Sequence, residues 1–311
     1  MEKVQVAIIG SGPAGLTAAI YAARAGLEPV IFAGTNIGGQ LMQTTLVENY
    51  PGFAEGVQGP ELMKNMLDQA KNMGAEVKYA VVSEVSFEKR PFYLKAGENE
   101  YEAESVIIAT GAVPKRLGLE SETKFWGKGV SSCATCDGAF YKDKVVAVVG
   151  GGSVAFEDAI YLTNHAQKVY LIHRREEFRA ERILVDQAKA SDKIEFVLNA
   201  EVEEILGDQK VAGVKLKRSE AAVGELEHKE LDVEGVFVAI GYIPTTEVFK
   251  GQVEMDEAGY IKKYEDSKTN VEGVFVAGDA EDFKYRQAIT AAGDGCRAAM
   301  DLDVWLRANQ Q

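Results

Sequence analysis

The stretch "VQVAIIGSGPAG", residues 4–15, decides the fold of this chain of 311 residues. Its first part, Val4–Gly10, predicts a buried strand, and "LTAAIYAARAG" from Leu16 to Gly26 predicts a helix. Between them Gly10, Gly12 and Gly15 have the G-x-G-x-x-G spacing, which allows a tight turn, a close approach to a pyrophosphate and close packing of helix on strand. The helix N-terminus faces the anion. The stretch therefore predicts a dinucleotide-binding unit.

The same pattern returns in the middle of the chain. "KVVAVVG", residues 144–150, predicts a second strand, and "GGSVAFEDAIYL" follows it. Gly150, Gly152 and Ala155 repeat the spacing, with alanine in the third place. Two such units predict two domains that bind two nucleotides. The alternative is one true site and one structural glycine turn.

The second unit carries a basic segment where its next strand ends. In "KVYLIHRREEFRAER" the predicted strand ends at His173. In a protein that binds NAD, this position has a carboxylate that accepts a hydrogen bond from the ribose. The chain instead offers Arg174, Arg175 and Arg179, whose guanidinium groups suit the 2′-phosphate of NADPH. The alternative is a solvated basic face that pairs with the neighbouring glutamates, Glu176, Glu177 and Glu181.

The first unit has the neutral Ala33 at the matching position, so other segments must define its nucleotide. "SVIIATGA" (105–112) and "VEGVFVAGDA" (271–280) each predict a strand that ends in a glycine turn. In the second, Asp279 follows Gly278, and its carboxylate can accept hydrogen bonds from a polyol chain. If residues 1–113 and 243–311 fold together, both segments flank the first glycine turn, which favours FAD with its ribityl chain.

Two connections that contain proline mark the domain boundaries, "GAVPKRLG" (111–118) and "GYIPTTE" (241–247). We therefore predict an α/β protein with two Rossmann-like dinucleotide-binding domains of the three-layer ββα type. The domain at 114–242 is inserted into the one formed by 1–113 and 243–311, and the paired connections can act as a hinge. Residues 285–306 predict a helix whose N-terminal residues face the cofactor.

The overall charge disfavours some partners. The chain has 34 basic and 48 acidic side chains, a net charge of -14, which repels nucleic acid and anionic membranes. No apolar run reaches the roughly 18 residues of a transmembrane helix, and the N-terminus does not read as a signal peptide. We therefore expect a cytoplasmic protein, in a compartment that keeps thiols reduced.

"SSCATCDGAF", residues 131–140, contains two of the three cysteines. A structural disulfide between Cys133 and Cys136 would close a loop of only a few residues and stabilise by roughly 2 kcal/mol. A zinc site would need two more ligands, and the remaining candidates are scattered: Cys296, His165, His173 and His228. The spacing favours a redox dithiol and no metal site, because a CxxC loop forms and breaks its disulfide with little backbone motion.

Two other residues bear on this reading. Asp137 follows the pair directly, where it can carry the proton that thiol–disulfide exchange moves, cap a helix, or do both. Cys296 falls on the apolar pattern of the last helix and is expected to be packed in the core.

Together these motifs resemble the low-molecular-weight thioredoxin reductases of bacteria. The resemblance runs from end to end in the same order, through "GSGPAG", "GGQLMQTTLVENYPG", "IIATGAVPK", "CATCDG", "HRREEFRAE", "VFVAGDA" and "YRQAITAAGDGC". It implies a homodimeric flavoenzyme that passes electrons from NADPH through FAD to a disulfide and then to thioredoxin. Cys136 would face the flavin, Cys133 would attack the substrate disulfide, and Asp137 would be the acid/base. Phe140 and Tyr141 would help to dock thioredoxin, or serve as core aromatics.

The resemblance also implies the nucleotide contacts. Those for FAD are Gly10, Ser11, Gly12, Pro13, Ala14, Gly15, Gly34, Gly39, Gln40, Asn49, Ala109, Thr110, Gly111, Gly278, Asp279, Arg286, Gln287 and Ala288. Those for NADPH are Gly150, Gly152, Ser153, Ala155, His173, Arg174, Arg175 and Arg179. Departures from the family pattern are Ser153 and Val154, where an acidic or Asn residue and then Ser or Thr is expected, and Ala139, where a second aromatic often lies.

A geometric conflict suggests a moving part. The inserted domain carries both the nicotinamide and the disulfide, yet each must reach the one flavin, and the dithiol must also meet thioredoxin. The hypothesis is a rotation about 111–118 and 241–247. Three other functions are possible alternatives. A flavin reductase or ferredoxin–NADP reductase needs no cysteine pair, and an alkyl hydroperoxide reductase flavoprotein carries an extra N-terminal domain. The third alternative is a non-catalytic nucleotide-binding module.

Overall fold

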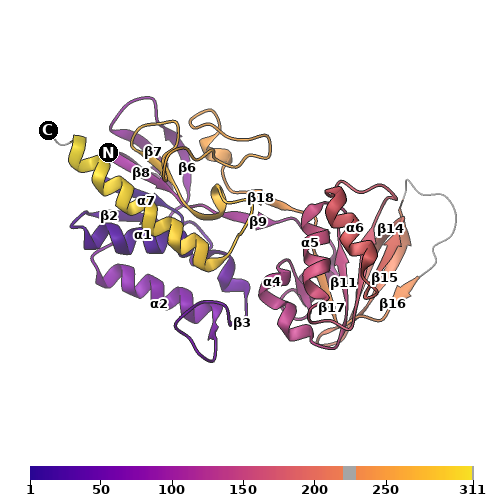
Figure 1. The fold of residues 1–311 in the computed structure, drawn as a ribbon. Coiled ribbons are helices and arrows are strands. Elements are labelled where there is room, and N and C mark those ends of the chain that lie inside the picture. The colour runs from indigo at the N-terminus through magenta and orange to yellow at the C-terminus, as the bar shows by residue number, and fades with distance from the viewer. Residues whose placement is uncertain (220–228, 310–311) are drawn as a thin grey trace. The chain divides into compact units, whose positions relative to one another are not determined.

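The structure is a computed structural model that describes residues 1–219 and 229–309. The chain divides into two compact units. One, here called the discontinuous unit, consists of Met1–Val113 and Ile243–Gln311, and the other, the inserted unit, is Pro114–Tyr242. Figure 1 shows the elements of each unit along the chain.

The discontinuous unit is built on a seven-stranded sheet of order β5-β2-β1-β8-β7-β6, in which β19 also pairs with β8. The long strand β8 explains this branching. Its first half pairs antiparallel with β7, and its second half, from Val106 to Ile108, pairs in parallel with β19. The strands are β1 (Glu2–Ile9), β2 (Pro29–Phe32), β5 (Glu76–Lys78), β6 (Val82–Ser86), β7 (Phe92–Ala96), β8 (Asn99–Ile108) and β19 (Val274–Val276).

Three helices pack against one face of the parallel strands of this sheet, and the β6–β7 hairpin, at the end of the strand order, packs against their other face. Alternate strand residues explain the layering, since Ile8 packs toward the helices and Ile9 toward the hairpin. The helices are α1 (Pro13–Arg24), α2 (Gly59–Asn72) and α7 (Ala288–Asn309). Helix α7 begins at Ala288 rather than at the predicted residue 285, because the backbone of Arg286 has a φ of 47°. The smaller elements are η1 (Gly39–Gln43), β3 (Leu46–Val47), β4 (Val57–Gln58), η3 (Glu247–Phe249) and η4 (Gly278–Ala280).

The inserted unit has a five-stranded parallel sheet and a smaller antiparallel one. The parallel sheet has the order β10-β17-β11-β12-β13, and the second sheet the order β14-β15-β16. The strands are β10 (Val130–Ser131), β11 (Val145–Val149), β12 (Lys168–His173), β13 (Ile194–Leu198), β14 (Ala200–Gly207), β15 (Val211–Arg218), β16 (Glu230–Leu231) and β17 (Gly235–Val238). The helices are α3 (Glu120–Phe125), α4 (Ala134–Asp137), η2 (Gly138–Tyr141), α5 (Ser153–Leu162) and α6 (Arg182–Ala190).

Both glycine turns occupy the predicted place in these sheets, directly after a central parallel strand and before a helix. The predicted class, α/β with two Rossmann-like units, is therefore confirmed. The two connections between the units pair as β9 (Ala112–Pro114) and β18 (Tyr242–Pro244). No helix in the described ranges is long and apolar enough to cross a membrane.

Candidate functional site

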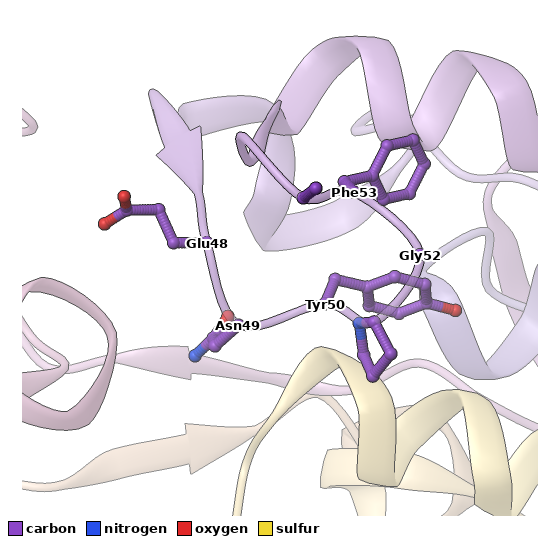
Figure 2. Close-up of a pocket in the computed structure, with 7 residues that line it drawn as sticks. Glu48, Asn49, Tyr50, Gly52 and Phe53 are labelled. Atoms are coloured by element: carbon purple, nitrogen blue, oxygen red, sulfur yellow. The ribbon is translucent and has the colours of Figure 1, made fainter.

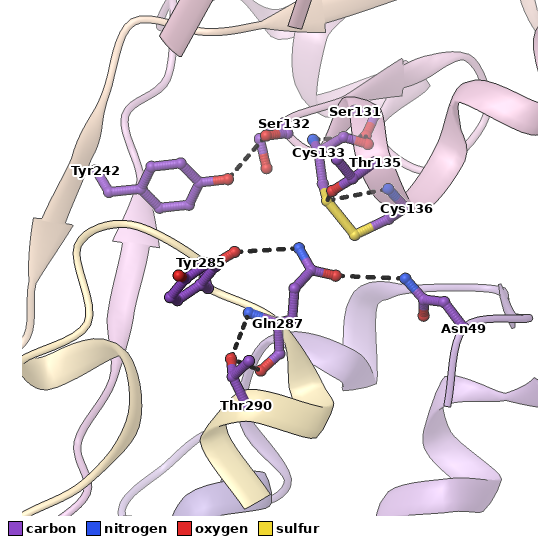
Figure 3. Close-up of a disulfide and its surroundings, with 10 residues drawn as sticks. All are labelled: Asn49, Ser131, Ser132, Cys133, Thr135, Cys136, Tyr242, Tyr285, Gln287 and Thr290. Atoms are coloured by element: carbon purple, nitrogen blue, oxygen red, sulfur yellow. Dashed lines mark hydrogen bonds between the residues drawn. A yellow bond between two sulfur atoms is a disulfide. The ribbon is translucent and has the colours of Figure 1, made fainter. Parts of the chain in front are cut away.

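The two cysteines of the CxxC segment form a disulfide at the start of helix α4 (Figure 3). Their sulfur atoms are 2.09 Å apart and their Cα atoms 5.3 Å apart. Cys133 is the N-cap residue, and its Sγ accepts a hydrogen bond from the backbone N–H of Cys136 at 3.2 Å. Cys136 is the more exposed of the two. The pair can therefore cycle between disulfide and dithiol in a short, locally ordered turn.

Two residues outside the CxxC motif fix the backbone before it. Ser131 Oγ accepts the backbone N–H of Cys133 at 3.0 Å, and the Tyr242 hydroxyl donates to the carbonyl of Ser132 at 2.7 Å (Figure 3). Tyr242 is distant in sequence and reaches the loop only through the fold. Both lie in segments that the sequence marked, 131–140 and 241–247, but neither belongs to the CxxC motif itself, and their support of the disulfide segment is seen only in the structure.

Asp137 is half-buried at the end of α4. Burial raises the pKa of its carboxyl above the ordinary value, and a hydrogen bond from Ser131 partly opposes that rise. Burial also raises the pKa of the neighbouring Tyr141 to about 12, with a contribution from the charge of Asp137. A carboxyl that keeps its proton at higher pH than usual, one residue from a thiol, is suited to proton transfer.

The two aromatic residues after this segment have different environments. Phe140 is 38% exposed. Tyr141 is half-buried and packs edge-on against the buried Phe237, with ring centroids 5.2 Å apart, at the margin of the core of the inserted unit. Tyr141 is thus a half-buried aromatic packed against the core, whereas its role in docking thioredoxin stays a prediction.

The first glycine turn is shaped by contacts that no side chain would allow. A Cβ on Gly10, whose φ is +116°, would lie 2.2 Å from the carbonyl oxygen of Ala109, and one on Gly15 would lie 2.1 Å from that of Gly10. Gly12 differs, because a Cβ there would meet no protein atom within 4 Å. Gly12 is also the N-cap of α1 and provides no side-chain cap, so the first N–H groups of the helix remain for an anion.

The surroundings of this turn also fit a polar ligand. The Thr110 hydroxyl is buried and has no hydrogen-bond partner within the described protein. Burial, together with the charge of Asp282, raises the pKa of Asp279 to about 7. Ser11 differs, since its hydroxyl already donates to the carbonyl of Ala33 and accepts from Gly38 N–H. The cradle with its unpartnered hydroxyl and nearby carboxyl suits a dinucleotide that carries further hydroxyl groups.

The structure brings together two predicted contact residues that lie 238 positions apart. Asn49 Nδ2 donates to Gln287 Oε1 at 3.3 Å, and Gln287 in turn donates to the carbonyl of Tyr285 (Figure 3). Asn49 also lines an open pocket of about 470 Å³ in the β3–β4 hairpin, shown in Figure 2. The lining residues are Glu48, Asn49, Tyr50, Pro51, Gly52, Phe53 and Ala54.

The remaining predicted residues of the first site lie on neighbouring segments of the same unit. Gly34 follows β2, and Gly39 and Gln40 begin η1, where a Cβ on Gly39 would approach Gly12 Cα to 3.3 Å. The carbonyl of Gly111 accepts the N–H of Thr245. Arg286 donates to the carbonyl of Phe283, and Ala288 is the first residue of α7.

The second glycine turn has the same construction. A Cβ on Gly150 would lie 2.4 Å from the carbonyl oxygen of Ala239 and 2.7 Å from the Cβ of Ala155. Gly152 is the N-cap of α5 with open space beside it, and Ser153 Oγ accepts the N–H of Glu181. Gly151, which the spacing rule does not mark, also lies close to a neighbour: a Cβ there would lie 2.2 Å from the His173 ring, which would have to move.

The basic segment lies directly beside this turn. Arg179 N–H donates to the carbonyl of Gly151 at 2.9 Å, which places the arginine loop against the glycines. Burial lowers the pKa of His173, and the nearby charges of Arg174, Arg175 and Arg179 lower it further. All three arginines are exposed. Within residues 1–219 and 229–309 none of them forms an ion pair, so pairing with Glu176, Glu177 or Glu181 does not account for them.

The third cysteine corrects one expectation. Cys296 is only half-buried, and its Sγ lies 3.8 Å from the sulfur of Met300 on an exposed turn of α7. It is not a packed core residue, because neighbouring Ala298 and Ala299 occupy the buried side of the helix. Among the residues that the structure describes, no group of three His, Cys, Asp or Glu side chains is placed to hold a metal ion. His228 lies outside them.

Comparison with known proteins gives similarity along the whole chain. Residues 4–295 match the family model described as pyridine nucleotide-disulphide oxidoreductase. A thioredoxin reductase of Rickettsia conorii is 53% identical over 307 residues, which cover 97% of this chain and 98% of that protein. One from Mycolicibacterium smegmatis is 51% identical over 302 residues, covering 97% and 96%. The solved structure of a thioredoxin reductase from Giardia duodenalis has a TM-score of 0.92 at 43% identity, covering 99% and 100%.

Proposed function

We infer what this chain does from one premise, that it belongs to the pyridine nucleotide-disulphide oxidoreductases and, within that family, to the thioredoxin reductases. The chain is an oxidoreductase that acts on a disulfide, with FAD and NADPH as its cofactors and thioredoxin as the protein that it reduces. When bound, the two cofactors supply a route for two electrons from nicotinamide to the disulfide. The observation that carries the proposal is the Cys133–Cys136 disulfide, next to Asp137 on a unit with its own dinucleotide turn.

We propose that the discontinuous unit holds FAD. Support comes from the open space at Gly12, the buried hydroxyl of Thr110 and the carboxyl of Asp279, which can bind phosphate, ribityl and ribose hydroxyl groups. Asn49 and Gln287, held together by their hydrogen bond, would orient the ring system. The other contacts are those named above at Gly34, Gly39, Gln40, Ala109, Gly111, Gly278, Arg286 and Ala288.

We propose that the inserted unit holds NADPH at its own glycine turn. The pyrophosphate would bind at Gly150–Ala155, and the exposed guanidinium groups of Arg174, Arg175 and Arg179 would bind the 2′-phosphate. His173 lies between the turn and these arginines and would pack against the adenosine ribose.

The proposed reduction of thioredoxin uses the dithiol in two exchanges. The Cys133 thiolate attacks one sulfur of the thioredoxin disulfide, that S–S bond breaks, and a mixed disulfide forms. The released thioredoxin thiolate takes a proton from Asp137. The Cys136 thiolate then attacks the sulfur of Cys133, which releases the second thioredoxin thiolate and restores the Cys133–Cys136 disulfide. Two electrons thereby pass from the enzyme dithiol to thioredoxin.

The rotation of the inserted unit about the β9 and β18 connections is part of the proposal. Its support is chemical: disulfide and nicotinamide are assigned to one unit and must each reach a flavin assigned to the other. The test is a pair of cysteines, one in each unit, joined by a non-reducible bismaleimide. Cross-linking should abolish turnover and still allow flavin reduction if the nicotinamide orientation is trapped. The same variant without cross-linker is the control, and full activity after cross-linking would refute the rotation.

We further propose that the chain acts as a homodimer in the cytoplasm, where NADPH and thioredoxin can sustain the cycle. Size measurement of the purified protein tests the first point. The function itself is tested by NADPH-dependent reduction of thioredoxin and of a small disulfide reagent, in wild type and Cys136→Ser. We expect wild type to be yellow and active, and the variant to bind FAD but not to reduce thioredoxin. A colourless wild-type protein would instead favour a nucleotide-binding module.

A further inference from the structure

Asn199 lies where two neighbouring strands of the inserted unit end side by side. Strands β12 and β13 pair in parallel register, with His173 opposite Leu198, so the residues that follow them leave the sheet at the same edge. The chain after β12 is the arginine loop, residues 174–181, and the residue after β13 is Asn199. Asn199 Nδ2 donates to Glu176 Oε1 at 2.9 Å, a contact between positions 23 residues apart.

The backbone at this position suits asparagine. The φ of Asn199 is 56°, in the left-handed region that asparagine adopts more readily than most residues. Its carbonyl accepts the N–H of Ser219 at 2.9 Å, and its side chain is half-buried. The amide donor therefore belongs to a turn whose conformation is fixed by β13 before it and β14 after it.

Other contacts hold the backbone of the arginine loop independently of Asn199. Arg179 N–H donates to the carbonyl of Gly151 at 2.9 Å. At the end of the loop, Glu181 N–H donates to Ser153 Oγ at 3.2 Å. Because these two bonds join the loop to the second glycine turn, loss of the asparagine amide would release the carboxylate that it binds without freeing the loop.

The carboxylate that Asn199 binds is the one directly after the two adjacent arginines. Glu176 follows Arg174 and Arg175 in the chain, and all three side chains are exposed. A carboxylate next to two guanidinium groups can pair with them, and it would then compete with a phosphate for the same donors. Within the described parts of the chain neither arginine forms an ion pair, and Glu176 Oε1 is bonded to the amide instead.

We propose that Asn199 is a specificity-determining residue for NADPH, which keeps the Glu176 carboxylate away from the arginines and so leaves their guanidinium groups free for the 2′-phosphate. The inference rests on the proposed binding of NADPH by this loop. Asn199 is a positioning residue, because it acts through Glu176 rather than on the nucleotide. Binding of NADH, which lacks the 2′-phosphate, does not depend on whether the arginines are free.

The experiment measures binding to the FAD-loaded enzyme by calorimetry, with adenosine 2′,5′-bisphosphate and adenosine 5′-monophosphate as probes. Asn199→Gly removes the amide and fits the positive φ. The freed Glu176 carboxylate should pair with the arginines and weaken binding of the bisphosphate about two- to fivefold, the range expected for an exposed ion pair. Binding of the monophosphate should change little. In turnover, KM for NADPH should rise by the same factor, whereas KM for NADH should not.

A second substitution separates the release of Glu176 from a loss of structure. Asn199→Gly combined with Glu176→Ala has no carboxylate to release, so binding of the bisphosphate should return to wild-type strength. Asn199→Gly combined with Glu177→Ala is the matched control. It removes the neighbouring exposed carboxylate instead, and binding should stay weak.

A second pair of variants covers the case in which Asn199→Gly fails to hold FAD. Asn199→Asp also tolerates a positive φ, and its carboxylate repels that of Glu176. Adding Glu176→Gln exchanges donor and acceptor, because the glutamine amide can donate to the new aspartate. We expect Asn199→Asp to weaken binding of the bisphosphate, and the exchanged pair to bind it more tightly than Asn199→Asp does.

Several results would overturn the inference. Wild-type affinity for the bisphosphate in Asn199→Gly would show that the amide has no effect on the arginines. A loss that Glu176→Ala does not reverse, or that Glu177→Ala reverses equally well, would show that Asn199 does not act through Glu176. The proposed function is tested separately by Arg174→Ala and Arg175→Ala. If both bind the bisphosphate as wild type does, the 2′-phosphate site lies elsewhere, whatever Asn199 does.

Discussion

The Tyr242 hydroxyl donates to the carbonyl oxygen of Ser132 at 2.7 Å, so a residue of the return connection β18 holds the backbone next to Cys133. This contact joins positions 110 residues apart in the sequence. It connects the disulfide to the strand about which we propose that the inserted unit turns. The loop is therefore supported on one side by Ser131 in β10 and on the other by Tyr242.

Tyr242→Phe tests that support. The substitution removes one hydrogen bond and keeps the ring, so we expect a loss of about 1 kcal/mol in the free energy of unfolding. Because the CxxC loop loses an anchor, turnover with thioredoxin should fall a few-fold, whereas reduction of the flavin by NADPH should be unchanged. Denaturant unfolding measures the change in stability, and stopped-flow absorbance measures turnover and flavin reduction. Tyr264→Phe, which removes a hydroxyl bond to Glu254, is the matched control and should leave turnover intact.

Gly10 and Gly12 should respond differently to the same change. Gly10→Ala forces a side chain onto a φ of +116° and 2.2 Å from a backbone oxygen, so the protein itself should be destabilised. Gly12 has a φ of -73° and open space, so Gly12→Ala should fold with nearly the wild-type unfolding temperature. The added methyl should instead lower FAD affinity about tenfold or more, because it occupies the position expected for the pyrophosphate. Equal FAD affinity in Gly12→Ala and wild type would contradict the proposed site.

The arginine segment should control nucleotide choice. Arg175→Ala and Arg179→Ala each remove a guanidinium group beside the second glycine turn, and each should raise KM for NADPH about tenfold or more, since a charge-assisted hydrogen bond is worth about 1.5–3 kcal/mol. KM for NADH should change little, because NADH lacks the 2′-phosphate. Steady-state kinetics with both nucleotides gives the ratio. Arg182→Ala serves as control, since Arg182 lies in the same basic segment but pairs with Asp186.

Asp279 should make the stability of the FAD-free protein depend on pH. Burial and the charge of Asp282 raise its pKa to about 7, against 3.8 ordinarily. Because the folded state favours the protonated form, its contribution is present at low pH and is lost as the pH rises to about 7. The difference of about 3 pH units corresponds to up to about 4 kcal/mol. Asp279→Asn should therefore stabilise the FAD-free protein at about pH 8 and have little effect near pH 4.

Denaturant titrations at the two pH values check this expectation, with the exposed Asp266→Asn as the control. A gain of stability in Asp279→Asn that is the same at both values would show that the ionisation of Asp279 is not responsible.

Local sequence was sufficient to predict the glycine turns, the cysteine pair and the basic segment, because each of these features depends on residues that are neighbours along the chain. The glycine turns needed only strand, spacing and helix, and the CxxC spacing indicated two cysteines that a single turn can join, as the start of α4 does. The position of the arginines beside the second glycine turn was also predictable, because they directly follow the end of strand β12. The family resemblance, now confirmed by full-length relatives, named Asn49 and Gln287, but no local rule pairs residues 238 positions apart.

The tertiary structure alone decided which side chains meet across elements. The packing of Tyr141 against the core depends on Phe237, and whether Cys296 is buried depends on which side of α7 faces α1. The close approach of Gly151 to the His173 ring likewise depends on how the next strand packs beside the turn. Ser131 and Tyr242 carry no motif, because hydrogen bonds to a backbone loop specify a distance and a direction, which only the packed fold supplies. Sequence therefore determined which chemical groups are present and the local turns that carry them. The tertiary structure determined which distant residues contact these groups and fix their positions.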